Sequence, residues 1–187
     1  LQEYPDNGVA FYNVAGMFRS AGMPKFALGT LKQLISRHSD NREARQALFE
    51  TMMEAGMSDD ARRHAESAFA LFPDDAGTLL NLSRVYRDAG ESALAEEVLR
   101  KGLERVLDKT QLNIALTELL LTRGETDKAD EAFKTIPETE TYRQQRLLLS
   151  ALIAGARTQW DTVLARCGEA ASANYPMPTR LLHVAAL

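Results

Sequence analysis

The stretch DAGESALAEEVL, Asp88 to Leu99, carries the pattern that decides the fold of this chain. Apolar residues on both sides of Gly90 have the spacing of amphipathic helices, which is i, i+3, i+7 before the glycine and i, i+4, i+8 after it. These residues are Leu79, Leu82 and Tyr86 on one side and Ala95, Leu99 and Leu103 on the other. The stretch therefore predicts two helices joined by a turn at the glycine.

The same pattern occurs three more times, as SAGMPKFALGTL from Ser20, EAGMSDDARRHA from Glu54 and TRGETDKADEAF from Thr122. The four turn glycines lie 34 residues apart (56 − 22, 90 − 56 and 124 − 90), and an alanine follows each of them by five residues. The glycines are Gly22, Gly56, Gly90 and Gly124, and the alanines are Ala27, Ala61, Ala95 and Ala129. A fixed period of this length predicts a solenoid built from one supersecondary unit.

Residues around the turn support a helix–turn–helix hairpin as that unit. A glycine can adopt the left-handed conformation that ends the first helix. Ser58, Ser92 and Thr126 occupy matching positions two residues after a glycine and are expected to cap the second helix. Pro24 fits the first turn of a helix, where its missing N–H leaves no hydrogen bond unmade.

The combination of residues resembles the tetratricopeptide repeat. Matching positions are Ser83, Tyr86, Gly90, Ala95, Leu99 and Gly102 in one unit, Gly56, Ala61, Ala68 and Pro73 in another, and Phe133 after Ala129. The resemblance implies an all-α fold, an α-α superhelix in which antiparallel helix hairpins stack as a right-handed solenoid with a 34-residue repeat. HEAT and armadillo units are longer, and the acidic charge disfavours the RNA-binding pentatricopeptide unit.

The period divides the chain into a single array over 1–187, and we expect it to be a piece of a longer chain. Residues 1–7 would end a preceding repeat, and 178–187 would form a partial or capping helix with Leu181, Val184 and Ala185 on one side. The five repeats between them are 8–41, 42–75, 76–109, 110–143 and 144–177.

The last two units depart from the pattern. Thr158 stands where the fifth glycine would be, and Val163 replaces the alanine. Cys167 falls on the inward stripe, which favours a buried apolar role over a nucleophilic one. Pro137 should shorten the second helix of the fourth unit by about one turn, so we expect the next helix to begin near Thr139 or Glu140.

Composition narrows the function further. The chain has 187 residues, of which 45% are hydrophobic, and a formal net charge of −4. This charge disfavours nucleic acid as a partner, and no apolar run approaches the ~20 residues of a membrane span. Because there is only one cysteine, cysteine usage does not separate a cytoplasmic from a periplasmic location.

No motif indicates catalysis, a cofactor or a metal. His38, His64 and His183 are isolated, and the sequence has no HExxH, CxxC, P-loop or GxSxG pattern. The segments PDD, Pro73 to Asp75, and SDN, Ser39 to Asn41, are interpreted as helix exits and N-caps at repeat junctions. We therefore expect neither enzymatic activity nor a bound cofactor.

A binding groove is the remaining hypothesis, because the first helices of stacked hairpins line a concave surface. The face adjoining their buried stripe is polar in the early repeats and apolar in the later ones. Its candidate peptide-binding residues are Tyr12, Arg19, Gln46, Glu50, Arg84, Arg87, Ile114, Glu118, Leu121, Leu148 and Leu152. Two alternatives remain open here, namely coverage of the apolar residues within the protein and pairing of Arg84 with Glu50 or Glu118.

Within the resembled family, one subtype binds chaperone tails through a clamp of Lys, Asn and Arg on first helices. The groove positions that would need Lys and Asn carry Tyr12 and Gly16 here, so we do not expect a chaperone-tail adaptor. The sequence favours a non-catalytic scaffold that binds a protein or peptide segment within a larger assembly, such as one for bacterial secretion, envelope biogenesis or polymer export. The alternatives are a recognition arm of an enzyme, such as a glycosyl- or sulfotransferase with its catalytic domain elsewhere, and self-association through Leu181–Leu187.

Overall fold

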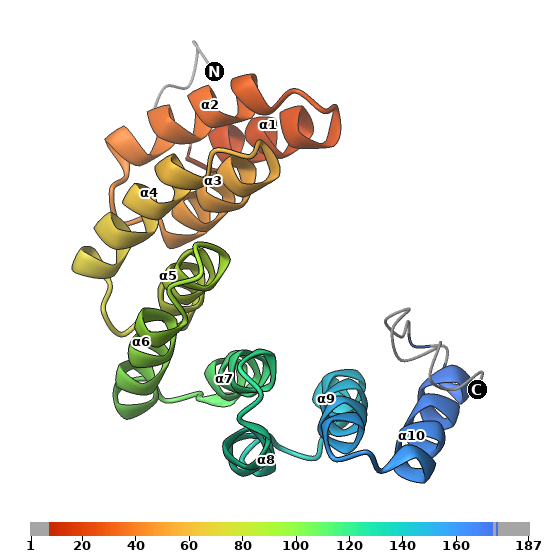
Figure 1. The fold of residues 1–187 in the computed structure, drawn as a ribbon. Helices are drawn as coiled ribbons and strands as arrows, with labels where there is room; N and C mark the ends of the chain where they lie inside the picture. Colours follow the sequence, from red (N-terminus) through yellow and green to blue (C-terminus); the bar gives the residue numbers. More distant parts are fainter. Residues whose placement is uncertain (1–7, 174, 176–187) are drawn as a thin grey trace. The chain divides into compact units, whose positions relative to one another are not determined.

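A computed structural model describes residues 8–173 and 175 of the chain, and the regular structure in that part is entirely helical (Figure 1). The helices in the first half are α1 (Gly8–Ser20), α2 (Pro24–Arg37), α3 (Arg42–Glu54), α4 (Ser58–Leu71) and α5 (Ala76–Asp88). The second half contains α6 (Ser92–Arg105), α7 (Thr110–Thr122), α8 (Thr126–Lys134), the 3-10 turn η1 (Glu140–Tyr142), α9 (Arg143–Ala156) and α10 (Trp160–Ser172).

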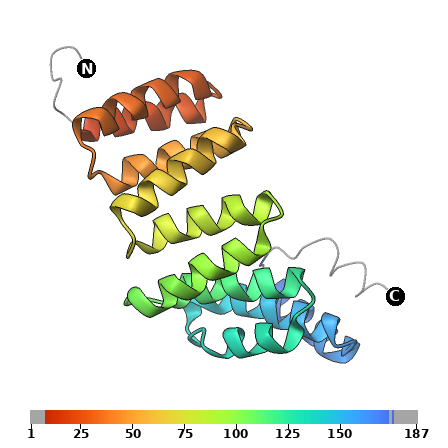
Figure 2. The ribbon, with the colours of Figure 1, turned by 60° about the vertical axis from the view of Figure 1, so that its left-hand side comes forward.

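The contacts divide the chain into two compact units, Leu1–Gly90 and Glu91–Leu187. In the first unit each helix packs on the next, from α1 to α5, and α3 also contacts α5 (Figure 2). In the second unit α6 packs on α7, α7 on α8, and α9 on α10, while α9 also contacts both α7 and α8. Consecutive antiparallel helices of this kind confirm the predicted all-α fold of stacked hairpins.

The turn glycine closes one helix while the residue after it opens the next. Gly22, Gly56, Gly90 and Gly124 have φ values of 68°, 69°, 78° and 75°, in the left-handed region that glycine tolerates. At the second of these turns the Met57 N–H donates to the Met52 carbonyl (N···O 2.9 Å), which is the closing bond of a Schellman motif. The four glycines thus have the turn role that the sequence predicts.

The prediction that hydroxyl side chains cap the second helices is wrong. Ser58, Ser92 and Thr126 are the first helical residues of α4, α6 and α8, and the position before each makes no side-chain capping bond. The physical reason is the length of the turn. Because the residue after the glycine belongs to the Schellman motif and is also the N-cap, the hydroxyl residue already lies inside the helix.

Side-chain caps occur instead where one hairpin passes to the next. Asn41 Oδ1 accepts a hydrogen bond from the Ala44 N–H before α3, and Asp75 Oδ2 accepts one from the Thr78 N–H before α5, both at 2.8 Å. Each bond satisfies one of the backbone donors that a helix start leaves unpaired. The interpretation of the SDN and PDD segments as junction signals is confirmed.

The fourth-to-fifth junction is irregular, as Pro137 predicts. Helix α8 has 9 residues, whereas α6 has 14, and Ile136 stays buried while the chain leaves the helix. The next regular structure begins with η1 at Glu140, followed directly by α9. The expected helix starts at 178, with Leu181, Val184 and Ala185, and the expected repeat end at 1–7 lie outside the described residues.

Candidate interaction surface

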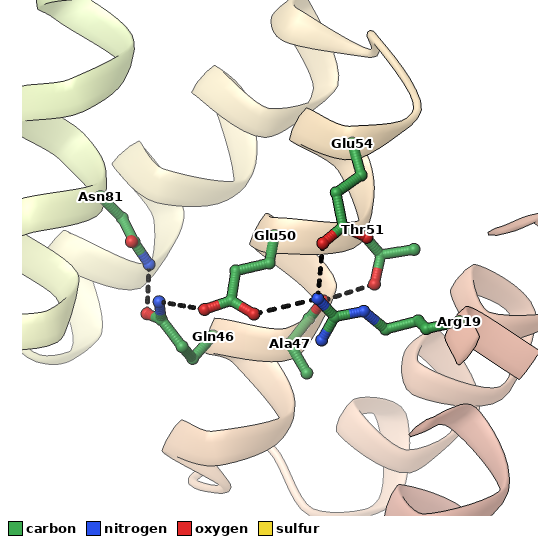
Figure 3. A network of polar contacts seen from close by, with 7 residues as sticks. All are labelled: Arg19, Gln46, Ala47, Glu50, Thr51, Glu54 and Asn81. Atoms are coloured by element: carbon green, nitrogen blue, oxygen red, sulfur yellow. Dashed lines mark hydrogen bonds and ion pairs between the residues drawn. The ribbon is translucent and has the colours of Figure 1, made fainter. Parts of the chain in front are cut away.

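A polar network joins the first helices α1, α3 and α5 of the first unit (Figure 3). One Nη atom of Arg19, from α1, lies 3.1 Å from Glu50 Oε2 and 2.8 Å from Glu54 Oε1, both on α3. The two glutamates are one helical turn apart, so their carboxylates converge on the same guanidinium. Two of the predicted groove residues, Arg19 and Glu50, are therefore in direct contact.

The network continues to α5 through two amide side chains. Gln46 Nε2 donates to Glu50 Oε1 (3.0 Å), and Gln46 Oε1 accepts from Asn81 Nδ2 (2.5 Å). Figure 3 shows the resulting chain of side chains from Asn81 through Gln46 and Glu50 to Arg19. Gln46 was among the residues selected from the sequence, whereas Asn81 was not. The signal for Asn81 is a polar amide inside the otherwise apolar stretch Leu79–Leu82.

The charged groups of this network are ionised, and its carboxylates outnumber its cations. The pKa of Arg19 is raised, first by its hydrogen bond to Glu54 and further by Glu50, while burial opposes the shift. The guanidinium therefore remains a cation, and it faces two carboxylates. Because these side chains are partly exposed, each ion pair is worth only ~0–1 kcal/mol, so the network aligns the helices more than it stabilises them.

A hollow of about 410 Å³ lies beside this network in the first unit. Its polar wall includes Tyr12, Gln46 and Asn81, one residue from each of the three first helices. The lining also contains Phe72, over whose ring the guanidinium of Arg42 lies 5.0 Å from the centroid. Tyr12 is 40% exposed, so its ring is accessible from solvent. The hollow combines amides and aromatic rings with the cations Arg42 and Arg45 and the carboxylates Glu43 and Asp75.

His64 also lines this hollow. Its Nε2 lies 3.0 Å from the backbone oxygen of Arg45, on the preceding helix α3. The pKa of His64 is lowered, chiefly because burial disfavours the imidazolium, and the charges of Arg45 and Lys32 act in the same direction. The neutral ring can donate its Nε2 proton to that carbonyl. This arrangement favours a structural role for His64.

The remaining groove candidates of the first unit, Arg84 and Arg87, lie apart from the network. Arg84 Nε is 3.8 Å from Asp88 Oδ2, and Arg87 Nε is 3.3 Å from Asp88 Oδ1. Asp88 is on the same helix, α5. The alternative in which Arg84 pairs with Glu50 is not what the structure shows, because Glu50 contacts Arg19 and Gln46 instead.

In the second unit the predicted apolar lining serves mainly as core. Ile114 is only 7% exposed and belongs to a buried cluster with Ile136 and Leu149, against which Leu121 packs. Leu148 and Leu152 are half-buried against a second cluster that contains Ala151, Ala154, Val163 and Cys167. The sequence left open the alternative that these apolar residues are covered within the protein. That alternative accounts for the burial of Ile114 and for much of the burial of Leu121, Leu148 and Leu152. Glu118 is exposed on α7.

A second hollow, of about 420 Å³, lies at the irregular junction between α8 and α10. It contains both cations and carboxylates, and they pair with one another. Arg146 contacts Glu138 and the Ile136 carbonyl and lies over the Phe133 ring, and Arg166 pairs with Glu169 at 2.8 Å. These internal pairs leave the hollow without a net charge that would select a ligand.

Among the described residues, no three His, Cys, Asp or Glu side chains are grouped closely enough to hold a metal ion. Burial raises the pKa of the Cys167 thiol, which agrees with the apolar role predicted for it. In the same part of the chain, no helix has both the length and the apolar character that crossing a bilayer requires.

Comparison with known proteins agrees with the hairpin architecture. Residues 53–111 match the tetratricopeptide repeat family model. No curated protein matches the sequence. Among solved structures, the chain is similar to a tetratricopeptide repeat protein from Parabacteroides merdae, with a TM-score of 0.72 and 17% identity over 96% of this chain and 71% of that one.

Two further structures have the same fold. The structure of PilF from Pseudomonas aeruginosa matches with a TM-score of 0.71 and 19% identity, covering 97% of this chain and 82% of that one. YrrB, described as a tetratricopeptide protein with an unusual peptide-binding site, matches with a TM-score of 0.64 and 17% identity, covering 100% and 95%. The resemblance seen in the sequence is thereby confirmed: residues 53–111 match the tetratricopeptide repeat model, and the chain has the fold of proteins built from such repeats.

Proposed function

We propose that the chain is a non-catalytic scaffold that binds a segment of a partner protein on the first helices α1, α3 and α5, within a larger assembly. The observation that carries the proposal is the row of Tyr12, Gln46 and Asn81 along one hollow, with one residue from each first helix. Ion pairs and hydrogen bonds between amide side chains already hold these helices in register. A preorganised row of this kind lowers the entropy cost of binding.

The chemistry of the row suits a peptide backbone. Each amide has two N–H donors and a carbonyl acceptor, which is more than the Asn81–Gln46 and Gln46–Glu50 bonds require. Such groups can pair with the N–H or the C=O of an extended segment. Tyr12 adds a rigid ring of the kind enriched at protein interfaces. The solved YrrB structure, which has this fold, is itself described as having a peptide-binding site.

The experiment compares partner capture by the wild-type chain and by Tyr12→Ala/Asn81→Ala. Gln33→Ala is the matched control, because Gln33 is exposed on α2 and does not line the hollow. Synthetic peptides are then made to cover the sequence of a partner that both the wild type and the control capture. The affinity of each peptide for the chain is measured by fluorescence anisotropy. We expect one peptide to bind, with at least a tenfold weaker Kd for the double variant.

Unchanged capture by a double variant that is still folded, as judged by circular dichroism, would contradict this proposal. Function would then lie on the second helices or elsewhere in the protein. Retained binding of the peptide with equal affinity would have the same meaning.

A further inference from the structure

The second unit contains a hollow that the proposed function does not use. Its volume is about 360 Å³, and its lining comes from the second helices α6 and α8 and from the first helix α7 between them in sequence. Much of this lining is apolar, namely Leu103, Leu116, Leu120 and Ala132. The amide side chain of Asn113 interrupts this apolar surface.

Asn113 stands where the repeat otherwise places mostly apolar residues. Its equivalents in the 34-residue register are Phe11, Arg45, Leu79 and Leu147. The three apolar equivalents are between 0% and 7% exposed, and Asn113 is itself only 9% exposed. Packing of a hairpin therefore does not require an amide at this position, and leucine fits there in two of the other repeats.

The side-chain amide of Asn113 lacks hydrogen-bond partners within the protein. Its backbone carbonyl accepts a hydrogen bond from Thr117 Oγ1 (2.7 Å), but its side chain makes no hydrogen bond to another described residue. A buried amide is costly unless its polar atoms are paired. A ligand group that enters the hollow supplies this pairing if it brings a donor for Asn113 Oδ1.

The charged groups around the hollow leave one carboxylate without an ion pair. Arg100 Nε lies 2.7 Å from Glu96 Oε1, and Lys128 Nζ lies 2.6 Å from Glu125 Oε2. Glu131 also lines the hollow, is exposed and has no ion pair with a described residue. The unpaired charge of the lining is therefore negative. The formal net charge of −4 on the whole chain also favours a cationic ligand.

We propose that this hollow binds an arginine side chain of a partner protein. The aliphatic stem of the arginine packs on the leucines of the lining, while its guanidinium donates to Asn113 Oδ1 and to the Glu131 carboxylate. Arginine is favoured over lysine because its planar group carries five N–H donors in a fixed fork, which can serve an amide and a carboxylate together. The hollow contains no residue of α1, α3 or α5, so this site is independent of the peptide site proposed above.

Titration of the isotope-labelled full chain with N-acetyl-arginine amide, followed by NMR, tests the proposal. We expect shifted amide signals in α6, α7 and α8. Glu131→Gln should weaken the affinity about fivefold or more, because it removes a charge-assisted hydrogen bond from an exposed position. Asn113→Leu should abolish binding in a chain that stays folded, since Leu79 and Leu147 occupy the same register position. Glu104→Gln is the matched control, because Glu104 is exposed on α6 and does not line the hollow.

A second set of ligands separates charge from shape and identifies the source of the arginine. Citrulline has nearly the size of arginine but no charge, so N-acetyl-citrulline amide should bind about fivefold more weakly or worse. Equal binding of the two derivatives would overturn the proposal, as would an unchanged affinity in Glu131→Gln. A wild-type spectrum without shifts at millimolar N-acetyl-arginine amide would also overturn it. Tighter binding of free arginine than of the capped derivative would assign the hollow to a free amino acid and contradict a partner protein.

Discussion

At the residue level, small side chains set how closely two helices of a hairpin approach. Ala27, Ala61 and Ala129 are completely buried. In α10 the same register position holds Val163, which is also completely buried. Gly155 of α9 lies near Val163, whose Cγ2 would be 3.9 Å from a Cβ added to the glycine, which is an ordinary van der Waals distance.

Thr158 carries backbone strain that its counterparts avoid. Its φ is 58°, and a β-branched residue in the left-handed region is disfavoured by about 1–3 kcal/mol. We expect Thr158→Gly to raise the free energy of unfolding by about 1 kcal/mol, after the extra freedom of glycine in the unfolded chain is included. Denaturant titration measures the change. Gly124→Thr at the equivalent turn should have the opposite sign, and a destabilised Thr158→Gly would show that the strain is absent.

His64 gives stability a pH dependence whose sign follows from its surroundings. Its pKa in the folded protein is lowered, so the unfolded chain takes up the proton first as pH falls below the ordinary histidine value of about 6.5. The contribution of His64 is therefore complete above that pH and is lost as pH falls towards the folded-state pKa. Unfolding measured between pH 5 and 8 should show a flatter pH dependence for His64→Gln than for wild type. Equal slopes would contradict this assignment.

At the level of helices, the sequence predicts what is local and misses what depends on neighbours. The glycine turns, the Asn41 and Asp75 caps and the shortened α8 follow from short-range rules for chain conformation. The groove residues do not, because helical spacing identifies one buried stripe only. Helix α7 contacts α6, α8 and α9, so it buries more than one face, and Ile114 becomes core. An apolar residue beside the main stripe has the same helical spacing whether it belongs to the core or lines a groove, so the sequence does not separate the two roles.

For the polar residues of the site, the sequence predicts the helix face on which they lie but not which of them contact one another. Arg19, Gln46 and Glu50 fall on the predicted face of their helices, and spacing alone places them there. Their mutual contacts involve residues 31 and 4 positions apart, Arg19 with Glu50 and Gln46 with Glu50. The longer contact depends on the rotation of α1 against α3. That rotation is set by packing between helices, which a one-dimensional pattern does not contain.

For the molecule as a whole, the period explains why stability should be distributed along the chain. Within each of the two units, the helices pack mainly on their neighbours in sequence, and repeat proteins of this kind behave as sums of repeats and junctions. The junction before α9 is the most irregular, since α8 ends early and η1 replaces a regular helix start. The hairpin α9–α10 depends on its own cluster of Ala151, Ala154, Val163 and Cys167.

This distribution predicts a local response to a buried charge. Val163→Asp places a carboxylate in a fully buried position without a partner, which costs roughly 3 kcal/mol or more. Thr162→Asp adds the same charge at an exposed neighbouring position and is the control. In native-state hydrogen exchange, amides of α9 and α10 should lose protection in Val163→Asp, while those of α1 to α4 keep theirs. Because coupling in a repeat array passes only between neighbouring units, equal loss from α1 to α10 would show that the chain unfolds as one cooperative body instead.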